Sequence, residues 1–259
     1  MSTQAIFAEI GEFSYVLPFK TQLLKWIGNK QRFAHETVSW FPVSYRNYYE
    51  PFPGSGAVLG TWKPKRAFAS DIFAPLFEIG QTLHGSPDLL QYWYRGRWNM
   101  MQPTEKFEAY ETTKASYNAS PNPANLLFHC RSCYGGVVRF RKQDGYMSIP
   151  CGIHYPISLE SFSQQTDLWR ERVKNVIFRK LDYRDAFKDV KKGDLVNCDP
   201  PYSGTQSIVY GAQSFNLESL FEAVVRCKSQ GAYVALSIDG KKLRRLELRT
   251  RHSGQAISA

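Results

Sequence analysis

The tetrapeptide Asp199-Pro200-Pro201-Tyr202 combines residue types that could hold a flat, amino-bearing ring. It follows the apolar run Leu195–Cys198, which predicts a position at the end of a buried strand. Proline fixes its own φ, biases the residue before it toward an extended backbone and has no N–H group. The carboxylate of Asp199 and the carbonyl of Pro200 could therefore accept both hydrogens of one amine. A Pro-Pro pair after a strand is also common in ordinary loops, so this tetrapeptide alone does not distinguish a binding site from a loop.

A glycine-rich turn follows the first β-prone segment. Tyr45–Glu50 runs into Pro51–Gly56, after which the apolar Ala57–Gly60 begins. This order predicts a strand, a tight turn and the start of a helix. Gly54 and Gly56 permit a positive φ and a close approach of the backbone to a ligand across the strand end. The third glycine of the dinucleotide fingerprint is missing, so a purely structural turn explains the segment equally well.

A second short strand, Ala67–Asp71, ends in an acid about 20 residues after Glu50, which is the layout of a nucleotide-binding βαβ unit. Asp71 could accept hydrogen bonds from a ribose diol, or it could cap the following helix. The sequence has no phosphate-binding loop that ends in Lys-Ser or Lys-Thr, which argues against ATP hydrolysis.

The composition indicates which class of binding partner and which cellular compartment to expect. The 259 residues carry 33 Lys and Arg against 23 Asp and Glu, a formal net charge of +10. This charge favours a polyanion, nucleic acid first and an acidic membrane surface second. No segment approaches the roughly 18 apolar residues of a membrane span, and the N-terminus lacks a basic region followed by an apolar one. We therefore expect a cytoplasmic protein.

The cysteine pattern argues against both disulfides and zinc. Five cysteines are an odd number scattered through a long chain. His129, Cys130 and Cys133 have metal-ligand spacing, but no second Cys-x-x-Cys completes a tetrahedral site. We expect buried thiols and no metal.

The elements that must position these residues alternate between strands and helices, and a long segment interrupts this alternation. Apolar periodicity predicts a first helix over residues 23–41. Between residues 77 and 176 the periodicity is weak and Trp, Tyr, Arg, Asn and Pro are frequent, which indicates an inserted domain. The alternation then resumes with the expected strand Val176–Arg179, strand Asp194–Cys198, helix Leu217–Ser229 and strand Ala232–Ser237.

Three ordered motifs resemble the DNA adenine-N6 methyltransferases of the alpha class, the Dam-like family. Lys25–Lys30 is similar to that family's KWxGxK motif, Glu50–Gly56 to its EPFxGxG cofactor loop and Asp199–Tyr202 to its DPPY catalytic motif. Residues 135–152 are similar to its target-recognition hairpin. The resemblance extends from about residue 20 to residue 240.

The resemblance implies an α/β fold with the Rossmann-like sheet of S-adenosylmethionine-dependent methyltransferases and an inserted target-recognition domain. Residues 1–76 and 177–240 would form the catalytic domain, residues 77–176 the recognition insert and residues 241–259 a basic tail. Members of the family continue past the DPPY motif with two more core strands, whereas residues 203–259 follow it here. The C-terminal part of the sheet is therefore expected to be incomplete or strongly diverged.

The implied activity is site-specific transfer of a methyl group from S-adenosylmethionine to the N6 amine of an adenine flipped out of duplex DNA. Asp199 and Pro200 would accept the amine hydrogens and Tyr202 would stack on the base, with no metal required. Two alternatives stay open: a non-catalytic DNA-binding remnant of such an enzyme, and an RNA or protein N-methyltransferase that uses the same pocket.

Further roles follow from the same resemblance. The expected cofactor-binding residues are Trp26, Lys30, Glu50, Pro51, Phe52, Gly54, Gly56, Asp71, Asp182, Tyr183 and Asp199. Tyr134, Arg139, Arg141 and Lys142 would contact double-stranded DNA, or would belong to a surface hairpin with its basic residues in water. We expect a monomer or weak dimer in bacterial, archaeal or phage-infected cytoplasm, with an associated restriction endonuclease as a further candidate partner.

Overall fold

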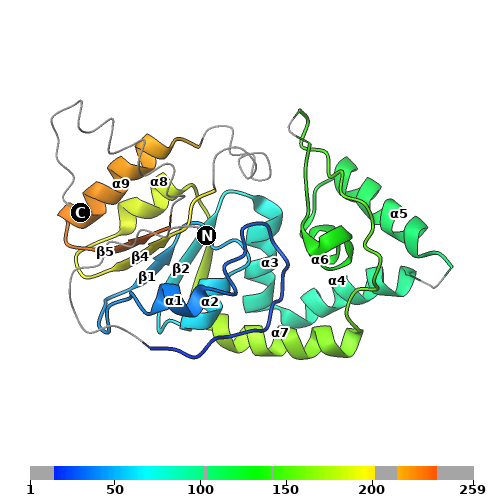
Figure 1. The fold of residues 1–259 in the computed structure, drawn as a ribbon, viewed down its shortest axis with the longest axis horizontal. Helices are drawn as coiled ribbons and strands as arrows, with labels where there is room; N and C mark the ends of the chain where they lie inside the picture. Colours follow the sequence, from blue (N-terminus) through cyan, green and yellow to red (C-terminus); the bar gives the residue numbers. More distant parts are fainter. Residues whose placement is uncertain (1–14, 102–103, 142, 202–214, 238–259) are drawn as a thin grey trace.

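The fold is an open parallel sheet with a helical lobe beside it (Figure 1). The structure, a computed structural model, describes residues 15–101, 104–141, 143–201 and 215–237. The sheet has the order β3-β2-β1-β4-β5, and every neighbouring pair is parallel. The strands are β1 (Tyr48–Glu50), β2 (Ala67–Asp71), β3 (Val176–Lys180), β4 (Leu195–Cys198) and β5 (Tyr233–Leu236).

Helices cover both faces of this sheet (Figure 1). Tyr48 of β1 packs into a core shared with α1, α2, α3 and α7, whereas Tyr49 points to the opposite core under α8 and α9. Successive residues of a strand point to opposite faces, so strands buried on both sides read as continuous apolar runs. The helices are α1 (Ala34–Val38), α2 (Ala57–Trp62), α3 (Ala74–Gly85), α4 (Pro87–Met100), α5 (Lys106–Ala119), α6 (Pro123–Ser132), α7 (Leu159–Val173), α8 (Tyr183–Ala186) and α9 (Leu217–Ser229), with 3₁₀ turns at Tyr134–Gly136 and Phe187–Asp189.

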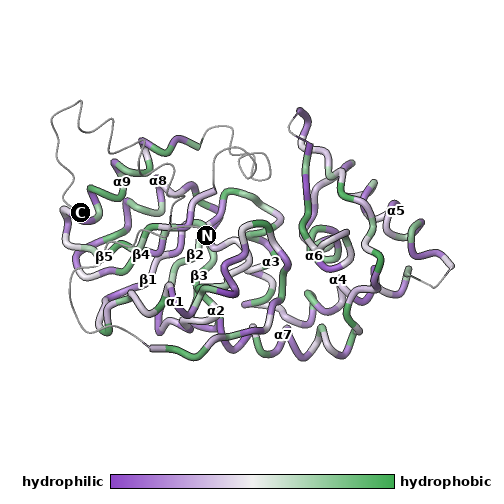
Figure 2. The backbone as a smooth tube through the Cα atoms, in the orientation of Figure 1, coloured by the Kyte–Doolittle hydropathy of each residue, from purple (hydrophilic) through white to green (hydrophobic). Residues whose placement is uncertain are grey.

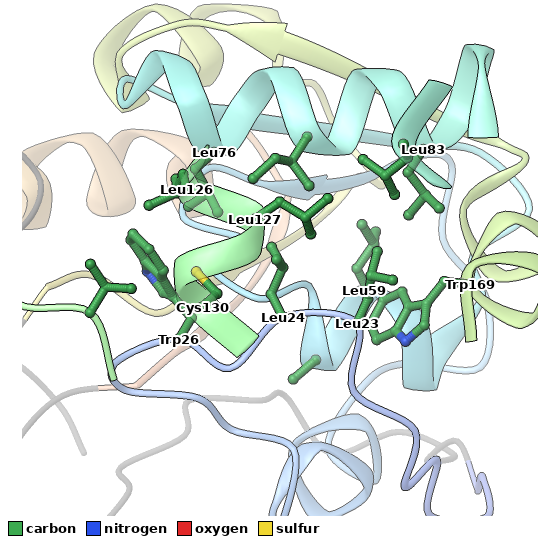
Figure 3. Packing of buried hydrophobic residues seen from close by; sticks show 14 of the residues in the cluster. Leu23, Leu24, Trp26, Leu59, Leu76, Leu83, Leu126, Leu127, Cys130 and Trp169 are labelled. Atoms are coloured by element: carbon green, nitrogen blue, oxygen red, sulfur yellow. The ribbon is translucent and has the colours of Figure 1, made fainter. Parts of the chain in front are cut away.

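The predicted helix over residues 23–41 is wrong, because its helical part is confined to α1. Gly28 has a φ of 73°, which interrupts any helix before that point. The apolar residues that suggested a helix are buried in irregular backbone: Leu23, Leu24 and Trp26 are 3%, 5% and 3% exposed. Figure 3 shows these side chains packed against leucines of α3 and α6 and against Trp169 of α7. The spacing of these apolar residues reflects their burial in the core and not the period of a helix.

The other predicted elements agree with the structure. β2 and α9 have the predicted bounds, and β3, β4 and β5 differ from prediction by one or two residues, whereas β1 begins at Tyr48 instead of Tyr45. The α/β fold class with a parallel sheet is thus confirmed. The proposed insert start at residue 77 lies inside α3, which packs against the sheet with Leu76 and Ile79 in the main core. The division into residues 1–76, 77–176 and 177–240 stays a proposal.

A long irregular hairpin, described over residues 133–141 and 143–152, leaves the helical lobe. Its two arms pair at Cys133 with Cys151 and at Phe140 with Met147. The hairpin alternates between buried and exposed positions, so Phe140 contacts the core while Arg139 and Arg141 are exposed. Figure 2 shows that the tip of the hairpin is hydrophilic.

Candidate active site

A large cavity lies at the carboxyl ends of the central strands. It encloses about 920 Å³, part of it open to solvent. Its walls come from residues 26–30, from the end of β1 and the turn after it (residues 50–55), from Asp71 at the end of β2, from residues 181–183 after β3 and from residues 199–201 after β4. The connections from β1 and from β4 run to opposite sides here, and such a switch point is where open α/β sheets bind ligands.

The cavity brings most of the predicted site residues together. Its lining includes Trp26, Lys30, Glu50, Pro51, Phe52, Gly54, Asp71, Asp182, Tyr183, Asp199 and Pro200. Gly56 does not line it: this glycine has a φ of 73°, and a Cβ there would lie 3.3 Å from the Trp169 ring. Tyr202 and Lys142 lie outside the described residues.

Glu50 ends β1 as a buried carboxyl, 2% exposed. The Tyr48 hydroxyl donates a 2.8 Å hydrogen bond to Glu50 Oε2. Burial raises the pKa of Glu50 to about 8; the Tyr48 hydrogen bond opposes this rise and the nearby Asp199 carboxylate adds to it. Tyr48 was not among the predicted site residues, although residues two apart on a strand share a face and its hydroxyl could have been expected beside Glu50.

Asp71 ends β2 and is 7% exposed. Its Oδ1 accepts a 2.9 Å hydrogen bond from the Phe73 backbone amide at the start of α3. Burial raises the pKa of Asp71 to about 7, while hydrogen bonds from the Phe73 and Ile72 amides oppose the rise. Asp71 therefore both supports the turn and faces the cavity.

Asp182 and Tyr183 form the cavity wall after β3. Asp182 is the N-cap of α8, and its Oδ1 accepts a 2.9 Å hydrogen bond from the Arg184 amide. Burial opposes ionisation here, but hydrogen bonds from the Arg184 side chain and amide lower the pKa of Asp182 overall. The Tyr183 ring lies 5.5 Å from the Phe52 ring and 6.0 Å from that of Phe215, centroid to centroid. Phe215 also lines the cavity, and no sequence motif marked it.

Asp199 follows β4, and Lys30 reaches it across the cavity. The Lys30 Nζ lies 3.2 Å from Asp199 Oδ1, with 16% and 19% of the two side chains exposed. This ion pair joins two motifs that are far apart in the sequence. The motifs predict both residues in one pocket, but they do not predict this contact.

The predicted DNA-contacting residues of the hairpin lie outside the cavity lining. Tyr134, Arg139 and Arg141 are exposed. Arg141 forms an ion pair of 2.7 Å with Asp144 and lies over the Tyr146 ring at 4.2 Å from its centroid. These contacts leave the planar guanidinium of Arg141 at the surface of the hairpin.

Helix α5 holds the second arm of this hairpin through side chains that bond its backbone. The Asn118 amide both accepts from Met147 N at 2.7 Å and donates to Met147 O at 3.2 Å. The Tyr110 hydroxyl donates to Ile149 O at 2.9 Å. The Lys106 Nζ donates to Gly152 O at 2.7 Å. The polar side chains of α5 thus fix where the hairpin stands.

The described residues contain no group of three or more His, Cys, Asp or Glu side chains placed to hold a metal ion. The thiols of all five cysteines are buried and free. Within the same ranges, no helix has the length and apolar character needed to cross a bilayer.

A known family matches the part of the chain that builds this cavity. The sequence profile of the D12 class N6 adenine-specific DNA methyltransferases matches residues 26–246, which include the cavity, the hairpin and, except for Lys25, all three motifs. The chain belongs to this family. The resemblance stated from the three motifs is confirmed, and the parallel sheet agrees with the Rossmann-like fold.

Individual relatives are similar at low identity. The chain is 27% identical to the retron Ec67 DNA adenine methylase of Escherichia coli over 71% of this chain and 65% of that protein. It is 24% identical to a DNA adenine methylase of Serratia marcescens over 70% of this chain and 66% of that protein. It is 22% identical to a type II methyltransferase of Lactococcus lactis subsp. cremoris over 82% of this chain and 79% of that protein. The chain thus spans just under two thirds of the first and the second of these relatives.

Proposed function

We propose that this chain transfers a methyl group from S-adenosylmethionine to the N6 amine of an adenine in double-stranded DNA. The observation that carries the proposal is that the Asp199-Pro200 acceptors line the same cavity as the buried acids Glu50 and Asp71. Membership of the D12 class supplies the reaction type and the target atom.

The residues of the cavity suit this cofactor. Glu50 would receive a cationic amine, because burial of its carboxyl favours a partner that can repay the desolvation. Asp71, at the end of the neighbouring strand, would accept from a ribose diol. Phe52 and Tyr183 offer rings to a flat base. When bound, S-adenosylmethionine supplies a methyl group already activated by a sulfonium, so the chain's residues have only to bind and orient.

Asp199 and Pro200 would prepare the amine. The lone pair of an exocyclic adenine amine is delocalised into the ring, which makes the nitrogen a poor nucleophile. The Asp199 carboxylate and the Pro200 carbonyl would accept its two hydrogens. This favours a pyramidal nitrogen with a localised lone pair that can attack the methyl group. Tyr202 would stack on the base. A paired base cannot enter such a pocket, so the adenine must leave the duplex at a cost of a few kcal/mol.

The recognition role falls to the lobe of residues 77–176. The exposed Tyr134, Arg139 and Arg141, with Lys142, would contact DNA, and the net charge of +10 favours association with a polyanion. The exposed guanidinium of Arg141 suits a phosphate or a guanine edge.

Incubation of the purified chain with methyl-tritiated cofactor and a panel of duplex DNA, RNA and protein substrates tests the proposal. We expect label in duplex DNA, and a loss of at least 100-fold in Asp199→Asn with cofactor affinity kept within about threefold. Label confined to RNA or protein would contradict the DNA assignment. Salt-sensitive DNA binding without cofactor binding or transfer would identify a non-catalytic remnant.

A further inference from the structure

Lys30 is delivered to the cavity by a well-anchored turn. Trp26 is 3% exposed, and its ring stacks on Phe73 at a centroid distance of 6.0 Å. The Asn29 amide donates to Trp26 O at 3.2 Å, and the Phe33 amide donates to Lys30 O at 2.8 Å. The base of the Lys30 side chain is therefore held by backbone hydrogen bonds on both sides, and from there its ammonium reaches the cavity.

The cavity offers this ammonium more than one acid. Glu50, Asp71, Asp182 and Asp199 all line it. Asp182 is paired with Arg184 at 2.7 Å. Glu50 accepts a hydrogen bond from the Tyr48 hydroxyl. The Lys30 ammonium forms an ion pair with Asp199.

Because the Lys30 and Asp199 side chains are close and mostly buried, Lys30 influences how Asp199 accepts hydrogen bonds. An ammonium only donates hydrogen bonds, so next to a carboxylate it favours the charged form, which only accepts. With 16% and 19% exposure the pair is shielded from most solvent, and it is screened less than a surface pair. A carboxylate in this state is the partner that an amine with two hydrogens needs.

We propose that Lys30 is a positioning residue for the Asp199 acceptor rather than a ligand of the cofactor: its ammonium holds the carboxylate in the direction from which an adenine amine is received. This inference rests on the proposed methyl transfer. Lys30 thereby receives a different role within the cavity. Loss of a cofactor ligand changes the Kd for S-adenosylmethionine, whereas loss of a positioning residue changes kcat.

Lys30→Met and Lys30→Arg in the full chain test the assignment, with Lys188→Met as the matched control. Lys188 lies in the 3₁₀ turn after α8, paired with Asp185 at the surface, where both side chains are exposed. For Lys30→Met we expect kcat to fall at least tenfold, while the Kd for S-adenosylmethionine, measured by calorimetry on the protein alone, stays within twofold of wild type. Lys30→Arg should recover most of kcat, and Lys188→Met should leave every constant unchanged.

A second substitution separates positioning from general damage. In an Asp199→Asn background, adding Lys30→Met should change the residual kcat by less than twofold, because the carboxylate that Lys30 positions is already gone. A Kd for the cofactor raised tenfold or more by Lys30→Met, or an unchanged kcat, would overturn the inference while leaving the proposed function standing. A wild-type chain that binds cofactor yet methylates no DNA would overturn both.

Discussion

At the scale of single residues, Glu50 and Asp71 connect the site to the stability of the protein. Burial raises their pKa values to about 8 and about 7, from 4.5 and 3.8. The folded chain therefore retains protons that the unfolded chain has released over this range. Their contribution to stability is fully present below the ordinary pKa values and is lost as the pH rises through the raised ones. Without a cationic ligand, this acid site therefore lowers the stability of the fold as the pH rises.

We expect the Tm of the cofactor-free protein to fall as the pH rises from 5 to 8. Glu50→Gln should flatten this dependence, because the amide keeps a partner for Tyr48 and carries no charge. Glu108→Gln, on an exposed position of α5, is the control and should retain the wild-type slope. Differential scanning calorimetry at several pH values measures the effect. A Tm that rises over this range in wild type would contradict the burial argument.

The sequence identified most of the cavity residues because two of the three motifs, and Asp71, lie at the carboxyl ends of strands. Glu50, Asp71 and Asp199 end strands that are parallel neighbours, so their side chains had to meet at one edge. Phe215 could not be predicted in the same way, because it lies outside the motifs and reaches the cavity only through the packing of α9. The Lys30–Asp199 pair depends on an irregular turn whose path no periodicity describes.

At the scale of elements, α5 determines the position of the hairpin. Asn118 pairs with the Met147 peptide as a neighbouring strand would, with one accepted and one donated hydrogen bond. We expect Asn118→Leu to weaken DNA binding at least fivefold with an unchanged Kd for the cofactor, because two backbone groups lose their partner and the hairpin is released. Fluorescence anisotropy with labelled duplex DNA measures this. The control is Thr112→Ala, at an exposed position of α5; equal affinity in both variants would show that α5 does not position the hairpin.

The junction of α2 and α7 depends on the absence of a side chain. A Cβ at Gly60 would lie 2.6 Å from two atoms of the Trp169 ring, and Trp169 is 2% exposed. We expect Gly60→Ala to lower the free energy of unfolding by about 1–3 kcal/mol despite the better helix propensity of alanine.

Gly96 in α4 is the matched control, because a Cβ there meets nothing within 4 Å. Gly96→Ala should raise the stability by about 0.5–1 kcal/mol. Urea denaturation of both variants gives the comparison, and a Gly60→Ala variant as stable as Gly96→Ala would refute the packing at this junction.

Regular elements with a clear period were predictable, and the irregular segment was not. β2 and α9 have the expected bounds because their apolar patterns have the periods of a strand and of a helix. Leu23, Leu24 and Trp26 satisfy a helical spacing equally well, yet Gly28 turns the chain and tertiary burial holds them. A buried loop with three anchors cannot be distinguished from a helix by hydrophobicity alone.

At the scale of the whole molecule, a net charge of +10 and an exposed basic hairpin predict binding that depends on salt. The affinity for duplex DNA should fall linearly with salt on a logarithmic plot, because bound counterions are released from the phosphates. Arg139→Gln should reduce the slope by about 1 if this side chain contacts a phosphate. Lys188→Gln, in the 3₁₀ turn after α8, should leave the slope unchanged. A slope insensitive to Arg139→Gln would remove that residue from the interface.

The central claim concerns one atom, the N6 of adenine, and one measurement addresses it directly. Unmethylated duplex DNA is incubated with the purified chain and S-adenosylmethionine, digested to nucleosides and analysed by mass spectrometry. We predict N6-methyldeoxyadenosine with wild type and at least 100-fold less with Asp199→Asn, since that residue would receive the amine of the flipped base. A modified cytosine, no modified base, or equal product from Asp199→Asn would contradict the account.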